Sequence, residues 1–147
     1  MEAANKGAQE AGGASVGLTI DLPFEEKHNE FIDSNRLINF DYFFIRKVMF
    51  VKYAQAFVVM PGGFGTLDEL LEAMTLIQTN KIKKFPIILV GKSFWSGLVD
   101  WLKNTLIEKN KTISEVDLDL FICVDTPDEV IDILKKFYLA TETGPNF

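Results

Sequence analysis

Short apolar runs rich in β-branched residues alternate with helical patterns along this chain. The apolar runs cover residues 15–20, 56–60, 86–90 and 120–124, and the helical patterns cover residues 2–11, 35–53, 67–78, 94–109 and 127–139. Such alternation predicts an α/β fold, because a crossover helix must separate two strands before they can pair in parallel. Near-continuous apolar strands are typical of sheets buried on both faces. We therefore predict a mostly parallel sheet with helices on both faces.

The two ends of this pattern carry helix-boundary signals. Gly12 and Gly13 follow the first predicted helix, and Thr126 with Pro127 opens the last one as N-cap and first helical residue. A chain of 147 residues suits one core, and no linker rich in Pro, Gly or Ser divides it. We therefore expect one domain over residues 1–139 and a loose tail over residues 140–147.

The chain enters its first helix without a preceding strand. A doubly wound domain normally begins with a strand and a ligand-facing turn. Either the sheet is smaller than usual or an N-terminal piece is lacking, and we expect the second.

Composition limits the classes of partner. Hydrophobic residues make up 48% of the chain, which is enough for a packed core, and the net charge of −6 argues against a nucleic-acid surface. The single cysteine, Cys123, excludes an internal disulfide and is expected in the core of a buried strand. No apolar run approaches the roughly 20 residues of a membrane span, and the N-terminus lacks a signal-peptide layout. We expect a soluble, cytoplasmic protein.

A glycine-rich turn stands between the apolar run 56–60 and the helical pattern 67–78, and residues 61–69 read Pro-Gly-Gly-Phe-Gly-Thr-Leu-Asp-Glu. Glycines let a backbone approach a phosphate closely, while the first turn of a helix adds unpaired N–H groups and the positive end of its dipole. Ligands of parallel sheets bind at the carboxyl ends of strands, where this turn lies. The turn predicts an anion site. The alternative is a capped turn without a ligand, although such a turn needs one glycine rather than three.

Two polar residues of this turn have the spacing of a capping box. Thr66 would be the N-cap and Glu69 its partner three residues later. Glu69 therefore has two interpretations, a helix cap or a catalytic carboxylate beside a bound phosphate. Asp68 and Glu72 are interpreted as charges on a solvated face.

A basic pair, Arg46 and Lys47, interrupts the aromatic and apolar segment 40–51. These side chains could simply extend to solvent along a helix edge. Beside the glycine turn, they could instead supply the cations that hold a phosphate.

Several other motifs are rejected. The glycine turn lacks the G-x-G-x-x-G spacing of dinucleotide sites. Gly91-Lys92-Ser93 resembles the end of a Walker A loop, but Pro86 stands where that loop requires its first glycine. No cluster has metal-ligand spacing. The only histidine, His28, lies in a polar segment and is interpreted as solvated, which argues against a His-dependent triad.

The basic pair and the glycine turn together resemble the RK and PGGxGTxxE signature of the LOG family, the cytokinin riboside 5'-monophosphate phosphoribohydrolases once labelled lysine decarboxylases. The similarity runs from Met1 to about Tyr138, and the second motif is highly specific. Residues 1–4 resemble the segment after that family's first glycine-rich turn, so the first strand and its turn are expected to be absent here.

The resemblance implies a Rossmann-like fold, a homodimer or a multiple of dimers, and cleavage of the N-glycosidic bond of a nucleoside 5'-monophosphate. It implies catalytic roles for Arg46 and Glu69. The implied substrate contacts come from the turn, the basic pair and the helix after the turn: Lys47, Gly62, Gly63, Phe64, Gly65, Thr66 and Thr75.

The residues themselves offer an anion cradle, a cation pair and one carboxylate. This set suits hydrolysis through an oxocarbenium-like state without a metal or an organic cofactor. Two alternatives stay open: a non-catalytic nucleotide-binding or carrier protein, and a pyridoxal-phosphate decarboxylase, for which no lysine is nominated by the sequence. Neither nucleic acid nor membrane is expected as a partner.

Overall fold

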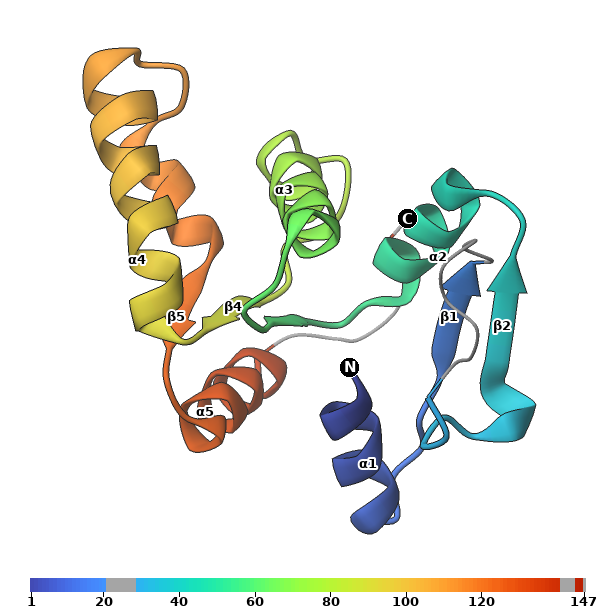
Figure 1. Ribbon diagram of the computed structural model, residues 1–147. Helices are drawn as coiled ribbons and strands as arrows, with labels where there is room; N and C mark the ends of the chain where they lie inside the picture. The colour runs from blue at the N-terminus through green and yellow to red at the C-terminus, as the bar shows by residue number, and fades with distance from the viewer. Residues whose placement is uncertain (21–28, 141–144, 147) are drawn as a thin grey trace. The chain divides into compact units, whose positions relative to one another are not determined.

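The computed structural model describes residues 1–20, 29–140 and 145–146 (Figure 1). The chain divides into two compact units, Met1–Val51 and Lys52–Phe147. Each unit contains its own small parallel sheet.

The first unit pairs two short strands. Its elements are α1 (Glu2–Glu10), β1 (Gly17–Ile20), the 3-10 helix η1 (Ser34–Arg36), β2 (Leu37–Phe40) and α2 (Phe43–Tyr53), whose last two residues belong to the second unit. β1 and β2 run parallel, with Gly17 opposite Leu37. The buried Ser15 fixes the approach to β1, because its hydroxyl accepts a hydrogen bond from Asn5 Nδ2 at 2.5 Å and its N–H donates to Asp33 Oδ2 at 3.1 Å.

The helix predicted over residues 35–53 is wrong in its first half, where the structure has η1 and β2. A short run such as Leu-Ile-Asn-Phe at residues 37–40 fits the helical and the strand periods equally well. Pairing with β1 supplies the hydrogen bonds that make this run a strand. The helical pattern holds only from Phe43 onward.

The second unit contains the three-stranded sheet that positions the glycine turn. Its elements are β3 (Phe57–Val59), α3 (Phe64–Gln78), β4 (Ile87–Val90), α4 (Lys92–Trp101), the π-helical continuation η2 (Leu102–Lys109), the 3-10 helix η3 (Glu115–Leu120), β5 (Ile122–Val124) and α5 (Pro127–Tyr138). The strands are parallel in the order β3-β4-β5. Val59 lies opposite Leu89, and Leu89 lies opposite Cys123.

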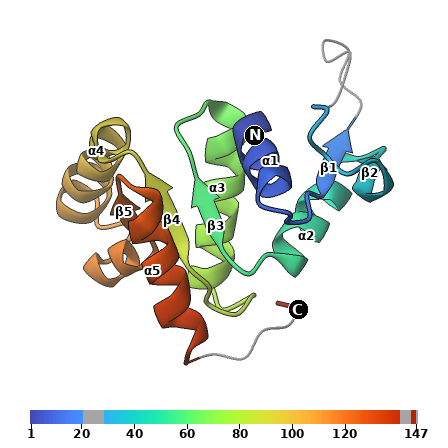
Figure 2. The same cartoon turned by 90° about the horizontal axis from the view of Figure 1, so that it is seen from below.

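β4 is the centre of this unit. Ile87, Ile88 and Leu89 are all buried, so both faces of the central strand are covered. α5 packs on one face, where Val130 meets Ile88 and Val124. α3 and α4 lie on the other side of the sheet from α5 (Figures 1 and 2). The predicted α/β fold with parallel strands and helices on both faces is confirmed, with the strands divided between two small sheets.

Both predicted helix-boundary signals are confirmed. α1 ends at Glu10, and Gly12 follows with a φ of 69° that favours glycine. Thr126 is the N-cap of α5 and Pro127 its first residue. Near the end of the chain, Asn146 is anchored in the second unit. Its N–H donates to Lys52 O at 2.9 Å and its Nδ2 donates to Ala54 O at 2.7 Å.

Candidate functional site

The glycine turn lies where the sequence predicts it, between β3 and α3 at the carboxyl edge of the second unit's sheet. α3 begins at Phe64, three residues earlier than the predicted helix, and Gly63 is its N-cap in extended geometry. Phe64, Gly65 and Thr66 therefore belong to the first turn of the helix. Their N–H groups point along the helix axis toward the space beyond its start.

The three glycines of the turn differ in what makes a larger residue unsuitable at each position. A β-carbon on Gly62 would lie 2.1 Å from Thr66 Oγ1, so the threonine side chain occupies the space that any other residue would need. A β-carbon on Gly63 or Gly65 would meet nothing within 4 Å. Packing within the described chain therefore does not require glycine at positions 63 and 65. Close approach of a ligand to the backbone would require it.

The predicted capping box at Thr66 and Glu69 is wrong. Because α3 begins at Phe64, Thr66 is its third residue and Glu69 its sixth, too far along the helix to cap its start. Glu69 is half-buried in the second helical turn. The interpretation of Glu69 as a cap is thereby removed, and the catalytic interpretation keeps its place as a prediction.

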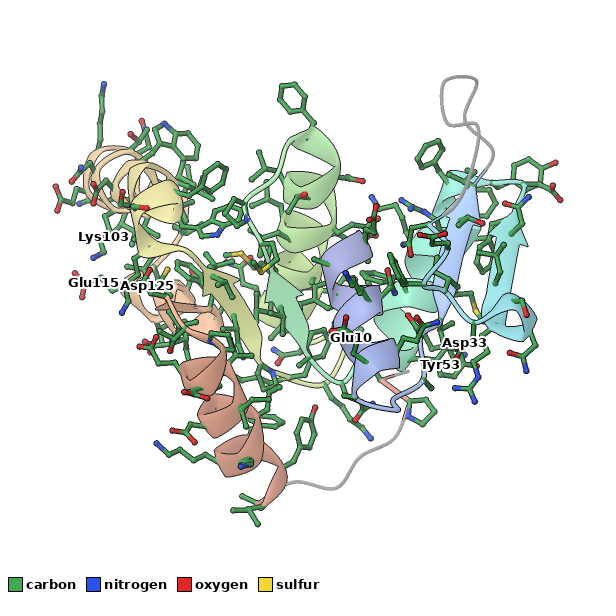
Figure 3. All side chains as sticks on the ribbon, turned by 60° about the horizontal axis from the view of Figure 1, so that its bottom comes forward. Glu10, Asp33, Tyr53, Lys103, Glu115 and Asp125 are labelled. Atoms are coloured by element: carbon green, nitrogen blue, oxygen red, sulfur yellow. The ribbon has the colours of Figure 1, made fainter. Side chains whose placement is uncertain are left out.

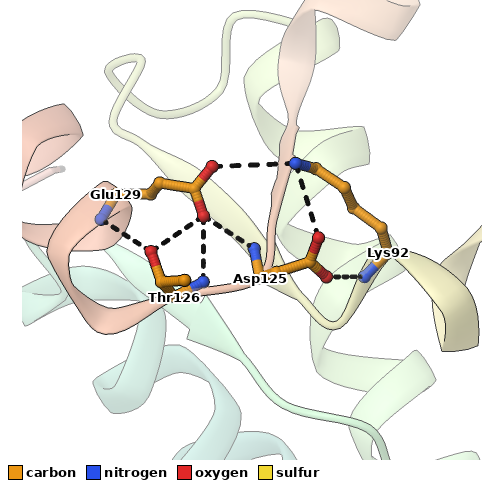
Figure 4. A network of polar contacts seen from close by, with 4 residues as sticks. All are labelled: Lys92, Asp125, Thr126 and Glu129. Carbon is orange, nitrogen blue, oxygen red and sulfur yellow. Dashed lines mark hydrogen bonds and ion pairs between the residues drawn. The ribbon is translucent and has the colours of Figure 1, made fainter.

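The other two helices that follow strands of this sheet have side-chain caps. At α4, Lys92 N–H donates to Asp125 Oδ1 at 2.8 Å. At α5, Glu129 N–H donates to Thr126 Oγ1 at 3.3 Å, and Glu129 Oε2 accepts the N–H groups of Asp125 and Thr126 at 3.0 and 2.9 Å (Figure 4). No side chain of the described residues caps α3. The N–H groups at the start of α3 thus lack the side-chain acceptor that α4 and α5 each have for one of theirs.

Sequence reasoning missed the polar network that links α4 and α5. Asp125, labelled in Figure 3, lies between β5 and α5, and Lys92 Nζ reaches its Oδ2 at 3.5 Å and Glu129 Oε1 at 3.6 Å. The Asp125 N–H, the Thr126 hydroxyl and the Thr126 N–H hold the pKa of Glu129 at about 2, well below its ordinary 4.5. Thr126 and Pro127 marked the helix start, but Lys92 and Asp125 are 33 residues apart and share no local pattern.

Phe64 and Thr75 occupy contrasting positions on α3. Phe64 is the first residue of the helix and is 93% exposed. Thr75 is exposed in the later part of the helix, where its hydroxyl donates to Leu71 O at 2.7 Å. Thr75 follows Thr66 by about 13 Å along the axis and on the opposite side, so the two hydroxyls do not converge. The ligand contact that the resemblance implies for Thr75 stays a prediction.

Arg46 and Lys47 lie on α2 in the first unit. Both are half-buried, and the Arg46 guanidinium lies over the Phe43 ring with its Cζ 5.6 Å from the ring centroid. A planar guanidinium held against an aromatic face has a restricted orientation, which suits a bidentate contact with a phosphate. The turn and Glu69 belong to the second unit.

Metal and thiol chemistry find little support in the described segments. They contain no group of three His, Cys, Asp or Glu residues able to hold a metal ion. His28 lies outside the described residues. Cys123 is half-buried on β5, and burial raises the pKa of its thiol, which makes it a poor nucleophile. Among the described helices, none has the length and apolar character needed to cross a bilayer.

The family follows from comparison with known proteins. A family model described as "possible lysine decarboxylase" matches residues 1–134, which include the basic pair and the glycine turn. This chain belongs to the LOG family.

Named relatives of this LOG-family chain occur in bacteria and plants. Proteins named cytokinin riboside 5'-monophosphate phosphoribohydrolase from Mycobacterium tuberculosis and Mycobacterium marinum are 31% and 29% identical to it, and each alignment covers 89% of the chain and 68% of the relative. The rice (Oryza sativa subsp. japonica) protein of that name, LOG, is 30% identical over 67% of the chain and 40% of its own length. The chain thus spans about two thirds of the mycobacterial relatives and less than half of the rice protein.

Proposed function

We propose that this protein hydrolyses the N-glycosidic bond of nucleoside 5'-monophosphates, cytokinin-type or purine, and releases the free base and ribose 5-phosphate. The observation that carries the proposal is the start of α3, which has no side-chain cap among the described residues and has open space beside Gly63 and Gly65. A phosphate placed there would accept the first N–H groups of the helix and would meet its positive dipole end. The names of the LOG-family relatives supply the reaction class.

Phosphate binding fixes the position of the sugar. Gly62, Gly63, Gly65 and Thr66 would hold the phosphate, with the Thr66 hydroxyl adding a side-chain donor beside Gly62. Lys47 and Phe64 would complete the substrate contacts. Thr75 would contact a part of the substrate far from the phosphate, because it lies well along α3.

Glu69 and Arg46 would carry the chemistry. As the glycosidic bond breaks, positive charge develops on the sugar ring, and the Glu69 carboxylate would stabilise that charge while orienting or deprotonating the attacking water. Arg46 would hold the phosphate or neutralise negative charge on the departing side. The reaction balances with water as the only co-reactant, so no metal or organic cofactor is required.

A panel of nucleoside 5'-monophosphates tests the proposal. Incubation with the protein should release free base and ribose 5-phosphate, detected by chromatography, and the matching nucleosides should be poor substrates. A non-catalytic carrier would bind the nucleotides and return them unchanged. A pyridoxal-phosphate decarboxylase would show the absorbance of the bound cofactor instead.

We further propose a homodimer or a multiple of dimers built on α2. Exposed apolar side chains surround this helix, including Phe43 (52% exposed), Phe44 (64%) and Phe50 (39%). A second copy of the same helix would cover such a surface. Light scattering should give a dimer or larger for the unmutated protein, and Phe43→Lys or Phe50→Lys should reduce the mass to that of a monomer. A monomeric unmutated protein with a normal circular dichroism spectrum would contradict this assembly.

A further inference from the structure

A chain of contacts runs along the carboxyl edge of the β3-β4-β5 sheet and ends at the glycine turn. It begins at Glu129, whose Oε2 accepts the N–H of Asp125 at 3.0 Å and the N–H of Thr126 at 2.9 Å (Figure 4). The Thr126 hydroxyl donates to the same oxygen at 2.9 Å. These bonds fix the backbone of Asp125 where β5 ends.

Asp125 connects the end of β5 to the start of α4. Its Oδ1 accepts the N–H of Lys92 at 2.8 Å, and its Oδ2 pairs with Lys92 Nζ at 3.5 Å. The two side chains are about half-exposed, so the ion pair contributes little by itself. The hydrogen bond from the backbone N–H to a carboxylate is the stronger and more directional link.

Gly91 transmits the position of Lys92 to the turn. Its φ of 97° lies in the left-handed region, and its N–H donates to Val124 O at 2.8 Å, which joins it to β5. On its other side, a β-carbon built on Gly91 would lie 3.5 Å from Pro61 Cγ. Pro61 is the first residue of the glycine turn, so its ring lies beside Gly91, with space for about one methyl group between the two residues.

We infer that Asp125 is a positioning residue for the phosphate site, acting through Lys92 and Gly91 on Pro61 and the glycine turn. The physical reason is the difference in capping among the three helix starts. Because α3 has no side-chain cap among the described residues, the direction of its first N–H groups depends on what packs against the turn. Asp125 takes no part in binding or chemistry itself. The inference rests on the proposed function, since it assigns a support to the site that would hold the nucleotide phosphate.

The central experiment compares Asp125→Ala with Asp125→Asn. Alanine removes the acceptor for Lys92 N–H, whereas asparagine keeps an oxygen at the same place. With AMP as substrate, we expect Asp125→Ala to raise KM by about 10- to 100-fold, as a small displacement of a positioning group can do. Asp125→Asn should restore most of the affinity. The inhibition constant of adenosine, which lacks the phosphate, should not change in either variant.

Two further variants separate positioning from general stabilisation. Lys92→Met keeps the N–H that donates to Asp125 and removes only the exposed charge, so its KM should stay near that of the unmutated protein. Asp117→Ala removes a similar capping box, at Ser114 before η3, and should leave KM unchanged. An unmutated KM in Asp125→Ala, or an equal rise in Asp117→Ala, would overturn the inference.

Amide hydrogen exchange tests the contact chain without any reaction. Gly91 N–H donates to Val124 O, and Leu67 N–H donates to Gly63 O at 3.1 Å within the turn. Asp125→Ala should accelerate exchange at both amides, and Asp117→Ala at neither. Unchanged exchange at Leu67 would overturn the inference even if the enzyme is active. If the unmutated protein cleaves no nucleotide but Leu67 responds, the proposed function fails and the support of the turn by Asp125 stands.

Discussion

Two helices begin at the same edge of one sheet and differ in how their first N–H groups are hydrogen-bonded. α5 follows β5 and satisfies its first N–H groups internally, with Thr126 and Glu129 in a capping box. α3 follows β3 and begins with glycines, and no described side chain caps it. A capped start is complete without a ligand, whereas an uncapped start leaves donors and the positive end of a dipole available for an anion. The start of α5 is therefore suited to stabilise the fold, and the start of α3 is suited to bind an anion.

The largest expected effect comes from removing the carboxylate that α3 carries behind its uncapped start. Glu69→Gln should lower the rate of base release by about 10²- to 10⁴-fold, because it removes a positioned carboxylate that acts on water and on the developing positive charge. Binding of AMP should persist. Asp68→Asn, an exposed neighbour on the same helix, is the matched control and should keep its rate. The rate is measured by chromatography of the released base, and an unchanged rate in Glu69→Gln would refute the catalytic role.

Filling the open space at the uncapped start should remove phosphate recognition. Gly63→Val would place a branched side chain where a phosphate would approach, and its extended backbone (φ −98°) tolerates the substitution. Loss of charge-assisted hydrogen bonds should weaken AMP binding by about tenfold or more and bring it toward that of adenosine. Calorimetry with both ligands measures the difference. Gly97→Val is the control, since Gly97 also has open space around it but lies within α4. Equal binding of AMP and adenosine by the unmutated protein would contradict a phosphate site here.

The two threonines sharpen the comparison further. Thr126→Ala should lower the free energy of unfolding by about 1 kcal/mol, the usual cost of losing an N-cap. Thr66→Ala should cause no such loss, because Thr66 is the third residue of α3, where alanine is well tolerated. It should instead weaken AMP binding. Urea denaturation measures both stabilities, and a cap-sized loss in Thr66→Ala would mean that α3 is capped after all.

The smallest expected effect is the pH dependence of the stability that the capping box of α5 contributes. Hydrogen bonds from the Asp125 N–H and from Thr126 lower the pKa of Glu129 from 4.5 to about 2 in the folded protein. The charged carboxylate therefore stabilises the fold above pH 4.5, and this contribution is lost as pH falls from about 4.5 toward 2. Melting temperatures of the unmutated protein and Glu129→Gln should converge across that range. Curves that stay parallel would show that Glu129 is not bonded in this way.

The alternation of strands and helices was predictable because it depends on local residue patterns. Four of the five strands in the described part of the chain, and the start of α5, follow from apolar runs and capping residues that act over a few positions. β2 was missed, since a four-residue apolar run fits two periods and becomes a strand only by pairing with β1. The start of α3 was placed too late for a related reason. Thr66 and Glu69 match a capping box locally, but the helix already begins at Phe64, directly after Gly63.

The basic pair at residues 46–47 and the motif at residues 61–69 were recognisable because each keeps its own residues contiguous. These motifs gave the family from the sequence alone, and the roles of their residues stay predictions. The link from Lys92 to Asp125 and Glu129 was not, because Lys92 follows β4 whereas Asp125 and Glu129 follow β5. Parallel pairing of β4 with β5 brings those ends together, and no local pattern records a contact between residues 33 positions apart. The tertiary structure also decided which helix start is capped, because α4 takes its cap from a residue that only the folded sheet places beside it.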